Sequence, residues 1–191
     1  MIALTCGHAT RGAPSPWIVR WSHLVKPGDT VLDVACGAGR HLVWFTERGH
    51  PCTGIDRDLA HVQDLGKKVA LHCADIECSP WPLLSNGLPA LFGAIVVTNY
   101  LWRPLIPTLL QSLSPGGVLL YETFAQGNET VGRPARADFL LRHGELLEIC
   151  RGMHTVAYED GYLDHPPRFV QRIAALRREV DANGPPLLYT L

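Results

Sequence analysis

Acidic residues and a pair of glycines stand where they could hold a nucleotide-sized ligand. Asp33 lies near the end of an apolar run that begins at Val31, and Gly37 and Gly39 follow it closely. Glycines let the backbone turn sharply and approach a ligand. A helical pattern begins at Arg40, so the strand, the turn and the helix N-terminus together predict a pocket at the carboxyl edge of a sheet.

The residues of this turn indicate the kind of ligand. A dinucleotide fingerprint requires a third glycine, but Leu42 stands at that position, so a pyrophosphate ligand is disfavoured. The carboxylate of Asp33 suits a cationic ligand better than a phosphate. Asp56 ends the next apolar run, about 20 residues beyond the turn, where an acid can bind two ribose hydroxyls. That spacing alone does not identify the nucleoside.

Apolar runs alternate with helical patterns along most of the chain, which predicts an α/β domain with a largely parallel sheet. A helix is expected over 15–25, with Ser15 as N-cap and Pro16 at its first position. Another is expected before Gly66, with Leu59, Val62 and Leu65 facing inward. Strands are expected near 31–34, 51–56, 69–73, 92–98, 118–124, 153–162 and 169–177, with a turn at 114–117.

Length and composition exclude several classes of protein. The 191 residues suffice for one domain, and 47% hydrophobic with 18% charged residues indicates a globular chain. A net charge of -1 gives no reason to expect nucleic acid as a partner, and no apolar run reaches membrane-spanning length. The first ten residues lack a signal-peptide pattern, so we expect a cytoplasmic protein. The six cysteines form no C-x-x-C pair, so free thiols and no metal site are expected.

The stretch Asp33–Gly39, D-x-A-C-G-x-G, resembles motif I of the class I S-adenosylmethionine-dependent methyltransferases, with Ala35 in place of the usual first glycine. Further motifs resemble one branch of that family, the small bacterial methyltransferases near those of tellurite resistance and thiopurine methylation. These motifs are N-Y-L-x-R-P-L at 99–105, Y-E-T-F at 121–124, G-R-P at 132–134 and F-L-L-x-x-x-E-L at 139–146.

The resemblance implies a fold. It is a doubly wound, Rossmann-like sheet of order 3-2-1-4-5-7-6 with the last strand antiparallel, in a three-layer αβα arrangement. A single domain would cover 1–191, with 1–14 as a loose N-terminal arm before the first helix. The family fold hosts many substrates, so it does not identify one.

The resemblance also implies a cofactor, S-adenosylmethionine, which leaves as S-adenosylhomocysteine after in-line transfer of its methyl group to a small molecule. Asp56 would bind the ribose, Asp75 would meet the adenine amino group, and Ile76 would pack on the adenine ring. The expected cofactor-binding residues are Asp33, Ala35, Cys36, Gly37, Gly39, Asp56, Arg57, Asp75, Ile76, Thr98 and Asn99.

Residues for the methyl acceptor are expected at the ends of two adjacent strands and in the loop after one of them. If Arg103 and Arg133 form the acceptor pocket, an anionic or strongly polar acceptor is favoured. Alternatively they pair with Glu122 and Glu129 and only brace the loop. The substrate-binding candidates are Tyr100, Arg103, Tyr121 and Arg133; the candidates for a general base are Tyr100, Glu122, Glu129 and His143.

Two other functions stay open. An NAD-dependent oxidoreductase would share the first strands, although the chain lacks the third glycine and a Tyr-x-x-x-Lys motif. A non-catalytic protein that binds S-adenosylmethionine would share every feature except turnover. The sequence leaves open whether the chain is a monomer or a homodimer.

Overall fold

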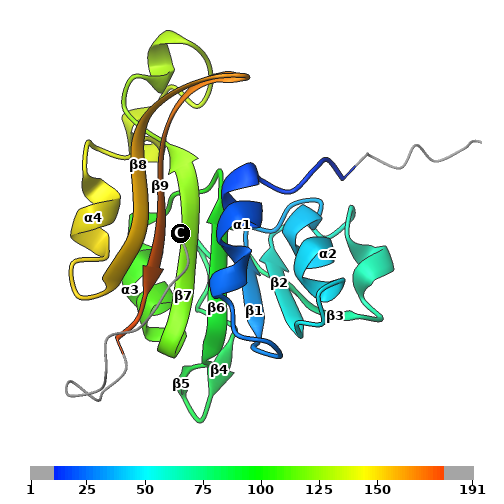
Figure 1. The fold of residues 1–191 in the computed structure, drawn as a ribbon. Coiled ribbons are helices and arrows are strands. Elements are labelled where there is room, and N and C mark those ends of the chain that lie inside the picture. Colours follow the sequence, from blue (N-terminus) through cyan, green and yellow to red (C-terminus); the bar gives the residue numbers. More distant parts are fainter. Residues whose placement is uncertain (1–10, 179–191) are drawn as a thin grey trace, which may run out of the picture.

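A seven-stranded sheet forms the centre of the computed structural model, which describes residues 11–178 (Figure 1). Its order is β3-β2-β1-β6-β7-β9-β8, and β9 runs antiparallel to both of its neighbours. Counted along the chain, these seven strands have the predicted order 3-2-1-4-5-7-6, which is therefore confirmed. The strands are β1 (Val31–Val34), β2 (Cys52–Asp56), β3 (Val69–Cys73), β6 (Phe92–Thr98), β7 (Leu113–Phe124), β8 (His154–Asp164) and β9 (Pro167–Leu176).

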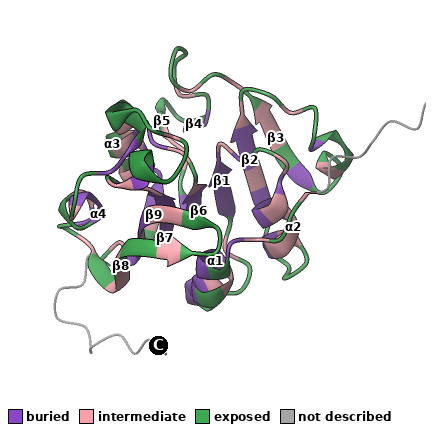
Figure 2. Ribbon diagram, turned by 90° about the horizontal axis from the view of Figure 1, so that it is seen from above, coloured by how far each residue is buried: buried purple, intermediate pink, exposed green. Residues whose placement is uncertain are grey.

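Helices cover both faces of this sheet, so the three-layer arrangement is also confirmed (Figure 2). Side chains of successive strand residues point to opposite faces, and β1 shows this, since Val31 and Leu32 belong to different core clusters. On one face lie α1 (Pro16–Trp21) and α2 (Arg40–Thr46); on the other lie α3 (Ile106–Gln111) and α4 (Glu145–Ile149).

Short elements complete the described chain. A small hairpin, β4 (Leu84–Ser85) with β5 (Leu88–Pro89), precedes β6. The 3-10 helices are η1 (Ser22–Leu24), η2 (Gln63–Leu65), η3 (Arg103–Leu105), η4 (Asn128–Thr130) and η5 (Ala137–Phe139). No helix in the described residues is long and apolar enough to cross a membrane.

The start of the first helix is as predicted. Ser15 is its N-cap, and the Ser15 hydroxyl accepts a hydrogen bond from the Trp17 amide at 3.2 Å, while Pro16 takes the first helical position. The expected helix over 15–25 is divided, because η1 replaces its last turn.

The prediction of a helix before Gly66 is wrong, since only the short 3-10 helix η2 forms there. The Asp58 amide donates to the Asp56 carboxylate at 3.0 Å, and the Ala60 amide donates to the Asp58 carboxylate at 2.9 Å. Such local side-chain bonds satisfy backbone donors outside a helix and compete with it. Val62 is nevertheless fully buried, so this side chain faces inward as expected even though no helix forms.

The turn expected at 114–117 lies inside β7, which begins at Leu113. Gly116 has a φ of +73°, and the pairing of β6 with β7 shifts between Phe92 and Ala94. The Gly117 carbonyl accepts from the Arg177 amide at 2.9 Å, so the segment is a bulge held by the residue that follows β9.

The loose arm expected over 1–14 is wrong for its described part, residues 11–14. The Arg11 Nε donates to the Ala38 carbonyl at 2.8 Å, and the Arg11 guanidinium pairs with Asp64. Arg40 also donates to the Ala13 carbonyl at 3.4 Å. The segment therefore packs beside the glycine turn. Residues 1–10 and the expected tail over 184–191 lie outside the described residues.

Candidate functional site

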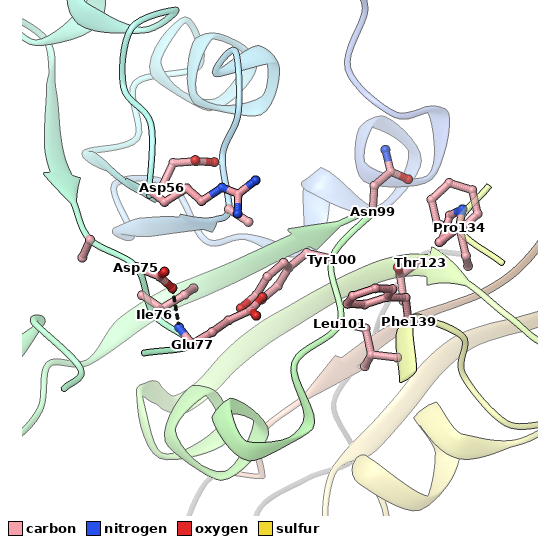
Figure 3. Close-up of a pocket in the computed structure, with 14 residues that line it drawn as sticks. Asp56, Asp75, Ile76, Glu77, Asn99, Tyr100, Leu101, Thr123, Pro134 and Phe139 are labelled. Carbon is pink, nitrogen blue, oxygen red and sulfur yellow. Dashed lines mark hydrogen bonds between the residues drawn. The ribbon is translucent and has the colours of Figure 1, made fainter. Parts of the chain in front are cut away.

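A cavity of about 560 Å³ opens at the carboxyl ends of the parallel strands, and its volume suits a small organic ligand (Figure 3). The lining segments end or follow five parallel strands, because the carboxyl ends of parallel neighbours meet at one edge of a sheet. The lining residues are Ala35 after β1, Asp56 and Arg57 at the end of β2, Ala74 to Glu77 after β3, Asn99 to Leu101 after β6, Thr123 and Phe124 at the end of β7, and Pro134 and Phe139 from the following loop.

The glycine turn between β1 and α2 needs its glycines for backbone geometry. Gly37 and Gly39 have φ angles of +51° and +75°, in the left-handed region that favours glycine. A Cβ at Gly39 would lie 2.8 Å from the Val62 Cγ1, so a side chain at this position would also clash with Val62. The Gly37 amide donates to the Asp56 Oδ2 at 2.8 Å, which ties the turn to the end of β2.

Asp56 is held in place by backbone donors. Its Oδ2 accepts from Gly37 and its Oδ1 accepts from the Asp58 amide at 3.0 Å. An ionised carboxylate oxygen can accept more than one hydrogen bond. The carboxylate therefore has a fixed position at the cavity and spare capacity to bind a pair of hydroxyls.

Ala35 occupies a strained position at the cavity. Its φ is +52°, a conformation that costs an L-residue with a Cβ about 1–2 kcal/mol. Asn99, at a φ of +54° across the cavity, belongs to a residue type that tolerates this region.

We expect Ala35→Gly to raise the free energy of unfolding by about 1 kcal/mol, because glycine removes the strain while adding some entropy to the unfolded chain. Urea unfolding of the two proteins measures this difference. A loss of stability would show that the Cβ of Ala35 makes contacts worth more than the strain.

Asp33 is buried beneath the turn, with 2% of its surface exposed. Its Oδ2 has no hydrogen-bond partner in the described structure, and the nearest cation-forming group, the His41 Nδ1, is 3.8 Å away. Burial raises the pKa of Asp33 to about 8, opposed by Arg40 and reinforced by Asp56. Burial and Arg40 lower the pKa of His41 to about 3, so this ring is neutral and its Nε2 accepts from the Ser15 amide at 3.1 Å.

The raised pKa of Asp33 has a consequence for stability. A buried acid that holds its proton more tightly in the folded state destabilises the fold as pH rises from its unfolded pKa, about 3.9, towards its folded pKa. We therefore expect the free energy of unfolding to fall between about pH 5 and about pH 8, by at most about 1.4 kcal/mol per pH unit from this group.

Asp33→Asn should remove that component of the slope, since asparagine does not titrate. Urea unfolding of both proteins at about pH 5 and about pH 8 tests this linkage. Equal pH slopes for the wild type and the variant would contradict the assignment to Asp33.

Six of the expected cofactor residues line the cavity: Ala35, Asp56, Arg57, Asp75, Ile76 and Asn99. The others shape its floor or lie beside it. Asp33, Gly37 and Gly39 set the turn, Cys36 is buried next to Gly54, and the Thr98 hydroxyl accepts from Arg40 at 3.5 Å.

The structure does not place Arg103 at the cavity. Its Nε and one terminal nitrogen donate to the two carboxylate oxygens of Glu145 at 2.7 and 2.9 Å, and its remaining donors reach the carbonyls of Asp138 and Leu140, each at 2.9 Å. The expected pairing with Glu122 or Glu129 is wrong. Arg103 instead holds the loop before α4 in place.

Glu122 and Glu129 are also absent from the cavity lining. Glu122 is 1% exposed on the α1 side of the sheet, where it accepts from the Ser15 hydroxyl at 3.1 Å and lies 3.5–3.6 Å from Arg168 and Arg172. Glu129 accepts from the Gly127 amide at 2.8 Å. A proton acceptor must reach its substrate, so these contacts argue against a general-base role for either residue.

The remaining acceptor candidates separate into one at the cavity and three away from it. Tyr100 lines the cavity, while the hydroxyl of buried Tyr121 donates to the Tyr100 carbonyl at 2.9 Å. Arg133 is exposed and does not line the cavity, and His143 pairs with Asp160 at 2.7 Å. Burial, with Glu77 as the next cause, raises the pKa of the Tyr100 hydroxyl, which argues against Tyr100 as a base at neutral pH.

Sequence reasoning missed most of the acceptor end of the cavity. Thr123 and Phe124 end β7 and could have been found from their place in the strand, as Tyr100 was. Pro134 and Phe139 reach the cavity only through the path of the 125–141 loop, which the sequence pattern does not give.

Comparison with known proteins agrees with this architecture. A family model described as methionine biosynthesis protein MetW matches residues 18–81. TehB from Haemophilus influenzae superposes with a TM-score of 0.67 at 20% identity, covering 84% of this chain and 61% of that one. A TehB-like methyltransferase from Corynebacterium glutamicum gives 0.60 at 15% identity, covering 85% and 87%. The chain has the fold of the class I S-adenosylmethionine-dependent methyltransferases.

Two curated methyltransferases are similar in sequence to part of the chain. The malonyl-acyl-carrier-protein O-methyltransferases of Serratia marcescens and Salmonella typhimurium are 31% and 32% identical over 109 and 102 residues. These matches cover 53% and 52% of this chain but only 41% and 40% of the relatives, so the chain spans less than half of their length.

Proposed function

We propose that the chain transfers the methyl group of S-adenosylmethionine to a small-molecule acceptor. The observation that carries this proposal is the cavity itself, where Asp56 stands at the end of β2 and Asp75 with Ile76 follows β3. This arrangement offers a ribose ligand, an adenine ligand and an apolar surface for the adenine ring in one continuous space.

The residues fit this cofactor in charge as well as in place. Three carboxylates, Asp56, Asp75 and Glu77, line the cavity against one guanidinium, Arg57. A surplus of negative charge favours a cationic ligand and disfavours the pyrophosphate of a dinucleotide, so the oxidoreductase alternative is weakened.

The protein's own contribution would be to align the reactants and to exclude water. Asp56 would fix the ribose, and Asn99 and Tyr100 would separate the cofactor part of the cavity from its acceptor part. S-adenosylmethionine, when bound, supplies an already activated methyl group. A general base is then needed only for an acceptor that must lose a proton.

Turnover distinguishes an enzyme from a protein that only binds the cofactor. The test is incubation of the purified protein with S-adenosylmethionine labelled in its methyl group and an extract of small metabolites, followed by separation of labelled products. We expect a labelled small molecule that is absent when Asp56→Ala replaces the wild type. Tight binding of S-adenosylhomocysteine without any transferred label would instead support the non-catalytic alternative.

A further inference from the structure

The acceptor part of the cavity carries no charged side chain. We define the apolar end as Leu101, Thr123, Phe124, Pro134 and Phe139, all of which line the cavity. In Figure 3, Leu101, Thr123, Pro134 and Phe139 lie together on the far side of Tyr100 from Asp56. Aromatic and aliphatic walls of this kind stabilise a flat apolar ligand by burial and ring contacts.

Two charged residues that lie close to this end in the sequence, Arg103 and Glu122, are committed elsewhere. Arg103 uses its donors on Glu145 and two carbonyls, and Glu122 points to the opposite face of the sheet. Both stand beside residues of the apolar end in the sequence, yet neither lines the cavity. An ionic group on the acceptor would therefore find no charged partner among the residues that line this end, and burying such a group unpaired is costly.

The charges that do line the cavity act against an anionic acceptor. Asp56, Asp75 and Glu77 outnumber Arg57 by three to one. This negative surplus attracts a cation and repels an anion that enters the same space. The anionic acceptor expected from Arg103 and Arg133 is consequently disfavoured.

The apolar end also lacks a group that could remove a proton. Its only hydroxyl apart from Tyr100 belongs to Thr123, and the Tyr100 phenol is neutral at physiological pH because burial raises its pKa. Glu77, the carboxylate that interacts with Tyr100, lines the cavity but is not part of the apolar end, so this end favours an acceptor whose nucleophilic lone pair is available without deprotonation.

From these observations, and resting on the proposed methyl transfer, we infer that the acceptor is an uncharged aromatic molecule with an unprotonated nucleophilic heteroatom, such as a ring nitrogen. The lone pair of that atom forms the bond to the methyl carbon, the methyl–sulfur bond breaks, and its electron pair stays on sulfur. The positive charge passes from sulfur to the methylated heteroatom, and no proton is released. The cavity carboxylates then face a cation before and after transfer.

Phe139 is the specificity residue that this inference singles out. It ends η5, its side chain is 37% exposed, and the Arg136 guanidinium lies 5.1 Å from the ring centroid. An exposed aromatic ring on a loop can change without loss of the core. Val131, on the same loop and 41% exposed, does not line the cavity and gives a matched control.

The test uses quinoline and quinoline-4-carboxylate, which share a ring nitrogen but differ in charge, at a pH where that nitrogen is unprotonated. Each is titrated into the protein saturated with S-adenosylhomocysteine. We expect quinoline to bind about tenfold or more tightly than the carboxylate. Phe139→Ala should weaken quinoline at least about fivefold, while Val131→Ala leaves it unchanged and both variants keep wild-type affinity for S-adenosylhomocysteine.

Turnover gives a second reading. With S-adenosylmethionine and quinoline as substrates, mass spectrometry should detect N-methylquinolinium. A pH-indicator dye in weakly buffered solution should show no proton release during the reaction. The inference is overturned if S-adenosylhomocysteine binds but the carboxylate binds as well as quinoline, if neither aromatic binds, or if Phe139→Ala behaves like Val131→Ala. Failure of S-adenosylhomocysteine to bind would instead remove the proposed function, and the inference with it.

Discussion

Asp56→Ala is expected to weaken S-adenosylhomocysteine binding by about 1.5–3 kcal/mol, or about 10- to 150-fold in the dissociation constant. The Gly37 and Asp58 amides already fix the orientation of the carboxylate, so it can accept hydrogen bonds from the two ribose hydroxyls without further ordering. Alanine removes the ribose acceptor and also releases the glycine turn from the end of β2. Calorimetric titration with S-adenosylhomocysteine measures the loss directly.

Asp58→Ala is the matched control for this variant. Asp58 is exposed, lies two residues farther along the chain, and accepts from the Ala60 amide at 2.9 Å without lining the cavity. It should keep wild-type affinity. If Asp56→Ala and Asp58→Ala bind S-adenosylhomocysteine equally well, Asp56 does not belong to the cofactor site.

Glu145→Ala is expected to lower the free energy of unfolding by about 2–4 kcal/mol near pH 7. Glu145 is 4% exposed and accepts from Arg103 twice, from the Arg142 amide at 2.8 Å and from the Arg142 Nε at 3.3 Å. Its removal leaves several donors without their acceptor. The loss should stay below that of a fully buried pair, because the Arg103 side chain is 35% exposed.

The pH dependence of this pair has the opposite sign to that of Asp33. Burial raises the pKa of Glu145, but hydrogen bonds from Arg103 and Arg142 and the charge of Arg103 lower it by more, so the net pKa lies below its ordinary value. The stabilisation is present above the ordinary glutamate pKa, about 4.3, and is lost as pH falls through the lower folded pKa.

Glu148→Ala, on the same helix, controls for the loss of a carboxylate. Its side chain is 63% exposed and lies 3.6 Å from Arg142, so we expect a change within about 0.5 kcal/mol. Urea unfolding of the three proteins gives the comparison. A Glu145→Ala loss as small as that of Glu148→Ala would contradict the bracing role assigned to Arg103 and Glu145.

The sheet could be predicted from the sequence because its signals are local. The run from Phe92 to Val97 is apolar and buried, as a strand covered on both faces requires, and with Thr98 it forms β6. Gly37 and Gly39 mark a turn whose φ angles disfavour other residues, so the edge that holds the cavity was also evident.

The acceptor end could not be predicted, because it depends on contacts between distant segments. Arg103 and Glu145 are 42 residues apart in the chain, and nothing in the spacing selected Glu145 over Glu122. The loop that brings Pro134 to the cavity is held by Asn128, which donates to the Pro134 carbonyl at 2.9 Å and accepts from the Phe169 amide at 3.2 Å. Such partners are fixed only when β9 and the loop pack together.

The most direct test of the central claim is calorimetric titration of the wild-type chain with S-adenosylhomocysteine and, separately, with NAD. The cavity at the strand ends, with its surplus of carboxylates and its anchored Asp56, predicts saturable binding of S-adenosylhomocysteine at a single site and no measurable binding of NAD. Saturable binding of NAD without binding of S-adenosylhomocysteine would contradict the account.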